Sequence, residues 1–300
     1  MPPFSPGAAG GGAAPSPTTS APGSSSTPNA PAPGSTLDRP QDGPVQVRPG
    51  SGGSGATEPV AGAGGTGAVT TPPAARTLSN VLVFSRTTGF RHDSIPAGIS
   101  AIQSLGQANG FSVQQTEDAA QFNDQALAAF QVVVFMSTTA DVLDAGQQAA
   151  FERYIAAGNG WVGVHSAADT EYDWPWYGGL LGGDAWFLIH PAIQTAELQV
   201  EQAEHPSTAH LPASFMLQDE WYNYRSNPRP EVNVLLRLNE ASYQVGEGAM
   251  GADHPIAWYH EYAGGRAWYT GLGHRIELYS DPQFVEHLLG GIRWASGASE

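Results

Sequence analysis

One stretch near the middle of the chain constrains the fold more than any other. Residues 161–170 read Trp-Val-Gly-Val-His-Ser-Ala-Ala-Asp-Thr. The apolar half predicts a strand buried on both faces, as in parallel sheets. Small residues follow His165, so the chain can turn sharply there and hold a polar side chain at the carboxyl end of the strand, where open α/β sheets bind ligands. The turn is similar to a nucleophile elbow, but its central residue is histidine.

The flanking pattern predicts the rest of an α/β fold. Apolar or alternating runs at 81–84, 111–117 and 132–136 predict strands. Two helices are expected, one capped by the side chain of Ser94 and one by that of Asp144. Strands that alternate with helices indicate a mainly parallel sheet flanked by helices.

The second half of the chain has a different pattern. Residues 192–202 and 232–238 alternate apolar and polar positions, which is typical of half-exposed strands. Strands at 255–261 and 266–270 flank Ala-Gly-Gly, so they predict an added antiparallel hairpin. A last helix is expected over 282–295.

Composition divides the chain at about residue 77. Residues 1–77 are mostly Gly, Pro, Ala, Ser and Thr, which bury too little surface to offset their ordering entropy, so this segment is expected to be a disordered tail or linker. Residues 78–298 carry all eight Trp and are expected to form one domain. Because such spacers are common in exported bacterial proteins, we hypothesise an exported or envelope-tethered protein. The sequence as given has no signal peptide, so the hypothesis requires a start codon upstream.

Charge and two missing residue types exclude several functions. The formal net charge of -16 disfavours nucleic-acid and anionic-lipid partners, and no apolar run reaches the roughly 18 residues of a membrane span. The chain has no cysteine and no lysine, so thiolate and Schiff-base chemistry are excluded. Chemistry must therefore use His, Asp, Glu, Ser, Tyr, Arg or a metal.

Polar residues at predicted strand ends are the candidates for a shared site. The expected catalytic residues are His165, Glu220, His274 and Asp169. The expected substrate-binding residues are Arg91, His92, Trp174, Tyr222 and His190. Aromatic neighbours of Glu220 are expected to raise its pKa by desolvation and suit it to acid–base work, and flat rings such as Trp174 and Tyr222 suit stacking on a sugar.

Simpler roles remain open for several of these residues. Asp169 could cap a helix, Glu220 could pair with Arg225, His274 could cap the helix that follows it, and the aromatic rings could be core. Ser166 as an acyl-transfer nucleophile, with His274 as its base, is an alternative that the missing glycine after it disfavours. A divalent metal is weakly indicated, with His92, His165, Glu220 and His274 as its candidate ligands, because no local histidine motif is present.

Taken together, the motifs resemble the ThuA-like, or trehalose-utilisation, family over residues 79–297. The segments that carry the resemblance are 81–92, Gly-Val-His-Ser-Ala-Ala-Asp at 163–169, His-Pro at 190–191, Asp-Glu-Trp-Tyr at 219–222, His-Pro-Ile at 254–256 and Gly-Leu-Gly-His at 271–274. The resemblance implies a flavodoxin-like sheet related to class I glutamine amidotransferases. Those enzymes have cysteine at the elbow and a histidine after a late strand. Here His165 replaces the cysteine, so glutamine hydrolysis is not implied, and His274 is expected near the late histidine.

The resemblance also implies a small-molecule carbohydrate as partner, because the family is linked to disaccharide catabolism, often beside oxidoreductases that make keto-sugars. The leading hypothesis is an enzyme that acts on a glycoside or its keto derivative by elimination, isomerisation or hydrolysis, with Glu220 or His165 as base and His92, His274 or a metal polarising the oxygen. A non-catalytic sugar-binding module and a Ser166-dependent hydrolase are the alternatives.

Overall fold

The computed structural model describes residues 76–298. The predicted disordered segment, residues 1–77, lies almost wholly outside the described residues. The export hypothesis depends on the same segment, so it stays a prediction. The described chain begins with an isolated parallel bridge between Arg76 and Ala298, so its two ends lie side by side.

Nine of the strands in the described residues form a single sheet in the order β2-β1-β3-β4-β11-β10-β9-β6-β7. These strands are β1 (Asn80–Phe84), β2 (Ser112–Thr116), β3 (Val132–Met136), β4 (Gly160–Val164), β6 (Gln194–Val200), β7 (Ser214–Asp219), β9 (Asn233–Asn239), β10 (His254–Tyr262) and β11 (Gly265–Thr270). A small separate sheet pairs β5 (Phe187–Ile189) with β8 (Asn223–Tyr224).

The first half of the sheet is parallel, from β2 through β1, β3 and β4 to β11. This is the flavodoxin-like strand order, with β11 in the fifth place. The strands β1, β3 and β4 are almost entirely buried, in agreement with the continuous apolar runs in the sequence. The predicted fold class is confirmed.

The second half is antiparallel, from β11 through β10, β9 and β6 to β7. The predicted hairpin is confirmed, since β10 and β11 pair around Ala263 and Gly264, which both have positive φ. Each antiparallel pairing reverses direction, so β7 and β9 run the same way as β11. The carboxyl ends of β1, β4, β7 and β11 therefore meet at one edge of the sheet.

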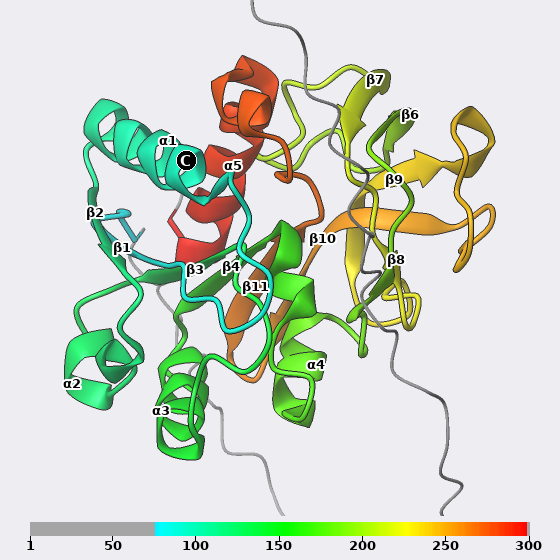
Figure 1. Ribbon diagram of the computed structural model, residues 1–300. Helices are drawn as coiled ribbons and strands as arrows, with labels where there is room; N and C mark the ends of the chain where they lie inside the picture. Colours follow the sequence, from blue (N-terminus) through cyan, green and yellow to red (C-terminus); the bar gives the residue numbers. More distant parts are fainter. Residues whose placement is uncertain (1–75, 299–300) are drawn as a thin grey trace, which may run out of the picture. The chain divides into compact units, whose positions relative to one another are not determined.

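Helices cover both faces of the parallel half (Figure 1). α1 (Ile95–Asn109) and α5 (Pro282–Ser296) lie together on one face. α2 (Asp124–Leu127), α3 (Ala145–Ala156) and α4 (Pro175–Leu181) lie on the other. Among the described residues, no helix is both long and apolar enough to cross a membrane.

Local capping explains where the helices begin and end. Asp144 forms the predicted cap of α3, in a capping box with Gln147, and Gly110 ends α1 in the left-handed conformation. Ser94 stands at the cap position of α1, but its hydroxyl donates to the carbonyl of Gly273 at 3.0 Å instead. The expectation that the Ser94 side chain caps the helix is therefore wrong, because this hydroxyl joins α1 to the loop after β11.

Candidate functional site

His165 occupies the sharp turn that the sequence predicted after β4. Its φ is 51°, the left-handed region that non-glycine residues rarely adopt, and its side chain is buried. Its Nδ1 lies 2.9 Å from the carbonyl oxygen of Gly271. A carbonyl only accepts hydrogen bonds, so Nδ1 carries the proton, and in the neutral ring Nε2 presents a lone pair. His165, and not Ser166, is the strained elbow residue.

Glu220 lies at the centre of three imidazoles. Its Oε2 is 3.3 Å from Nε2 of His165 and 3.1 Å from Nδ1 of His274, and its Oε1 is 3.2 Å from Nδ1 of His190. Burial alone raises the pKa of Glu220, but the contacts with His165 and His274 outweigh it and hold the pKa well below its usual range. The predicted rise is therefore wrong, because burial beside imidazoles favours the carboxylate.

His274 is positioned by the residue before Glu220. The buried carboxylate of Asp219 accepts the backbone N–H of Gly273 at 2.7 Å and that of Arg275 at 3.1 Å, so it holds the chain on both sides of His274. Burial lowers the pKa of His274, but the hydrogen bond with Glu220 and the negative charges of Glu220 and Asp219 outweigh this, and the net pKa is raised. His274 does not cap the 3-10 helix that follows it (Ile276–Ser280), because Arg275 occupies the cap position.

His92 enters from the loop after β1. Its Nδ1 lies 3.2 Å from the hydroxyl of Ser166, and its ring stands edge-on to His165 and His274 at centroid distances of 4.8 and 5.2 Å. Burial and the neighbouring imidazoles lower the pKa of His92 to about 3. His92 is therefore neutral at physiological pH.

The structure thus brings together four groups that are far apart in sequence: His92, His165, Glu220 and His274. Each offers one donor atom, and these atoms all lie within 4.8 Å of one another. Such a set can exchange protons with a bound substrate or hold a cation.

Other predicted residues form the surroundings of this cluster. His190 is partly exposed beside Glu220, and the buried ring of Tyr222 packs against His165 with centroids 4.4 Å apart. Asp169 accepts a hydrogen bond from Tyr172 and forms no hydrogen bond or ion pair with the four groups. Arg225 lies over the Tyr172 ring, 4.1 Å from its centroid, and is not paired with Glu220.

Two predicted substrate-binding residues lie apart from the cluster. Arg91 forms an ion pair with Glu117, 2.6 Å long and half exposed. Trp174 is buried at the start of α4, where its indole N–H donates to Glu152 of α3 at 3.0 Å and its ring stacks on Trp176. The structure does not bring either side chain to Glu220, because their partners hold them elsewhere.

Sequence reasoning missed two residues that the geometry singles out. Asp219 was noted only as a neighbour of Glu220. Phe90 is 67% exposed, and its ring stands edge-on to His92 at 4.9 Å. Phe90 could have been noticed in the sequence because an aromatic residue stands there two positions before a site histidine. Nothing in the local sequence indicates that Asp219 holds the loop after β11.

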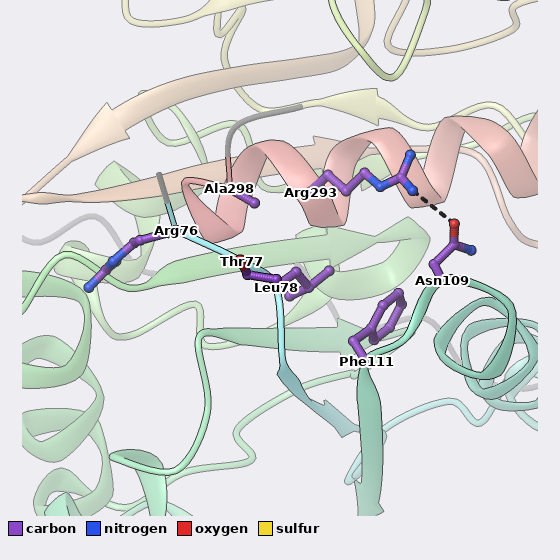
Figure 2. A pocket seen from close by; sticks show the side chains of 7 residues that line it. All are labelled: Arg76, Thr77, Leu78, Asn109, Phe111, Arg293 and Ala298. Carbon is purple, nitrogen blue, oxygen red and sulfur yellow. Dashed lines mark hydrogen bonds between the residues drawn. The ribbon is translucent and has the colours of Figure 1, made fainter. Parts of the chain in front are cut away.

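A cavity of about 390 Å³ lies at the opposite edge of the sheet (Figure 2). Leu78 and Phe111, which precede β1 and β2, line it at the amino ends of these strands. Arg293 extends toward Asn109 at 2.8 Å, and Arg76 points away from both. None of the described residues that line this cavity is His, Asp or Glu, so it lacks the chemistry of the four-group cluster.

The sequence model of the ThuA family, described as trehalose utilisation, matches residues 80–295. The chain belongs to this family. Its elbow, which carries His165, and its late-strand His274 both lie within the matched ThuA region. No curated protein matches the sequence.

Solved structures agree with the ThuA assignment. A ThuA-like protein from Bacteroides uniformis is 26% identical with a TM-score of 0.62, over 75% of this chain and 95% of that one. Another from Parabacteroides merdae is 18% identical with a TM-score of 0.58, over 73% of this chain and 90% of that one. The second likeness concerns the fold alone.

Proposed function

We propose that this ThuA-family chain is a carbohydrate-processing enzyme that acts on a disaccharide or glycoside, or on its keto derivative. The family description, trehalose utilisation, supports the substrate class. The observation that carries the proposal is the convergence of His92 with the cluster of His165, Glu220 and His274 at the carboxyl edge of the sheet. Ligands of open α/β sheets bind at this edge.

A keto-sugar suits the groups present. The ketone acidifies the neighbouring C–H bond, so one base and one electrophilic group are sufficient. His92 is neutral and outside the contacts of Glu220, so it accepts the proton, while the electron pair moves onto the carbonyl oxygen beside His274. In isomerisation the proton then returns to the former carbonyl carbon, while the hydroxyl proton of the neighbouring carbon moves to the former carbonyl oxygen, so that the ketone shifts by one carbon. In elimination the enolate instead expels the alkoxide one carbon further, and the alkoxide takes the proton. General acid–base catalysis of this kind contributes about 100- to 10,000-fold.

We therefore assign the role of base to His92, whereas the sequence suggested Glu220 or His165. Glu220 is held as a carboxylate by two imidazoles, and Nε2 of His165 faces Glu220 and His274. Of these groups, His274 is the one suited to polarise the substrate oxygen, because its raised pKa favours the protonated ring and Glu220 supports that positive charge. Exposed Phe90 beside His92 offers an apolar face against which a sugar ring can stack.

The contacts do not favour a Ser166-dependent hydrolase. Ser166 is fully buried, its hydroxyl faces His92 and not the proposed base His274, and the strained elbow conformation belongs to His165. A fluorophosphonate probe that labels Ser166 would reverse this preference.

The test is turnover of trehalose, simple glucosides and their 3-keto derivatives by the full chain. We expect turnover of a keto derivative, and His92→Gln should reduce kcat at least about 100-fold because the base is lost. His210→Ala, an exposed histidine bonded to the carbonyl of Gln283, is the matched control and should retain activity. Binding of these sugars without any product would instead identify a sugar-binding module, and neither binding nor turnover would end the proposal.

A further inference from the structure

We propose that Nε2 of His165, Nδ1 of His274 and Oε2 of Glu220 form a site for one divalent transition metal of the zinc type, with an open coordination position beside His92. The inference goes beyond the proposed carbohydrate chemistry, because it depends on these donor atoms and on no substrate.

The three donor atoms form a nearly equilateral triangle. The distances are 3.3 Å between His165 and Glu220, 3.1 Å between His274 and Glu220, and 3.3 Å between the two imidazole nitrogens. Zinc binds nitrogen and oxygen at about 2.0–2.1 Å in tetrahedral geometry, which places its ligands about 3.3–3.4 Å apart. An octahedral face with the same bonds requires about 2.8–3.0 Å. Two of the three edges have the tetrahedral length.

In the neutral tautomer of His165, hydrogen bonding leaves part of this triangle unsatisfied. Nδ1 of His165 donates a hydrogen bond to the carbonyl of Gly271, so Nε2 of the neutral ring has only a lone pair. A proton on Nδ1 of His274 can satisfy Glu220, but the lone pairs of His165 and Glu220 then still face one another. A cation at the centre accepts all three lone pairs at once.

The surroundings fix each donor in the way that metal sites require. The carbonyl of Gly271 sets the tautomer of His165, His190 contacts the second oxygen of Glu220, and Asp219 holds the backbone on both sides of His274. Such outer contacts orient ligands and are worth about 10- to 100-fold in metal affinity.

His92 completes the group of four without closing the site. Its ring centroid lies 4.8 Å from that of His165 and 5.2 Å from that of His274, and its Nδ1 contacts the hydroxyl of Ser166, outside the triangle of the other three donor atoms. Two histidines and one glutamate with a free fourth position are the ligand set of catalytic zinc sites such as that of thermolysin. His92 therefore stands where it can contact a water or substrate oxygen on the metal.

The experiment measures metal directly. The full chain, purified without a histidine tag and stripped with chelator, is titrated with Zn(II) and, as a spectroscopic probe, with Co(II). We expect one equivalent of metal per chain and the intense visible absorption of four-coordinate Co(II). His274→Ala and Glu220→Gln should each weaken Zn(II) binding by about 100-fold or more, with folding checked by circular dichroism, whereas His210→Ala should bind like the parent.

The open position has its own test in His92→Ala, which should weaken Zn(II) binding less than tenfold. Equal loss in His92→Ala and His274→Ala would overturn the open site. No binding by the parent, or undiminished binding by folded His274→Ala, would overturn the metal site itself. Because no sugar is present, a chain that binds zinc and turns over no sugar contradicts only the proposed function.

Discussion

Two groups of histidines, one on α5 and one at the carboxyl edge of the sheet, differ in where their ring nitrogens point. On α5, both nitrogens of the buried His287 have protein partners: Nδ1 is 2.7 Å from the carbonyl of Ser207 and Nε2 is 3.2 Å from the hydroxyl of Thr270. At the carboxyl edge of the sheet, the nitrogens of His165 and His274 face each other and Glu220. The first arrangement uses every hydrogen bond internally, and the second directs donor atoms toward one shared point.

Neither burial nor a shifted pKa separates the two groups. Burial lowers the pKa of His287 to about 3, and burial with neighbouring imidazoles lowers that of His92 to about 3 as well. The contacts separate them, because a histidine whose two nitrogens are satisfied by the fold has nothing left to offer a ligand. Three experiments test this difference between the two groups of histidines.

The largest effect is expected in stability. His287→Ala removes a ring that packs on Trp268 and leaves the partners at Ser207 and Thr270 unsatisfied, so it should lower the free energy of unfolding by about 3 kcal/mol. His92→Ala also removes a buried ring but loses a single hydrogen bond, to Ser166, so it should cost about 1 kcal/mol less than His287→Ala. Urea denaturation of the metal-free chains measures both. Equal losses would mean that the two groups are alike.

The next effect is on pH dependence. The folded pKa of His287 is about 3 and that of His205 about 4, both below the unfolded value of about 6.5. The unfolded chain therefore binds more protons as the pH falls below 6.5, and stability is lost between pH 6.5 and the folded pKa, at about 1.4 kcal/mol per pH unit for each histidine.

This loss can be assigned to one residue by comparison. His287→Ala should show a slope of unfolding free energy against pH that is smaller than the parent's by about 1.4 kcal/mol per unit between pH 6 and 4, since all other groups titrate in both chains. An unchanged slope would show that His287 is not held neutral by the fold.

The smallest effect concerns the loop after β11. In Asp219→Asn, the single acceptor oxygen cannot serve the N–H groups of both Gly273 and Arg275, so His274 should lose part of its alignment. We expect zinc affinity and kcat to fall about tenfold while the melting temperature changes little. Asp253→Asn, which alters a half-exposed partner of Arg229, should change neither quantity. A purely structural role for Asp219 would instead lower the melting temperature and leave zinc affinity unchanged.

Several features followed from local sequence. The buried strands at 132–136 and 160–164 were predictable because continuous apolar runs bounded by turn residues are typical of parallel sheets. The hairpin at Ala263 and Gly264 was predictable because few residues tolerate positive φ. His92, His165, Glu220 and His274 could be selected because each follows a predicted strand or lies in a recognisable motif.

Other features depended on partners that are distant in sequence. Arg91 forms an ion pair with Glu117, and Trp174 packs on α3. No local pattern indicates these partners, so the sequence did not show that both side chains are held away from the site. The direction of the pKa shift of Glu220 was mispredicted, because the aromatic neighbours are visible in the sequence and the imidazoles are not.

Residue type and short-range periodicity were enough to predict the alternation of strands and helices, the elbow at His165 and the exclusion of thiol and lysine chemistry, whereas the flavodoxin-like sheet was implied by the family resemblance. The direction of β7 was visible in the fold and not in the sequence: β7 runs in the direction of β11 and so brings Glu220 to the edge where His165 and His274 lie. That direction results from four successive antiparallel pairings. Each pairing is made by backbone hydrogen bonds, and the local sequence of a strand does not show which strand will be its neighbour.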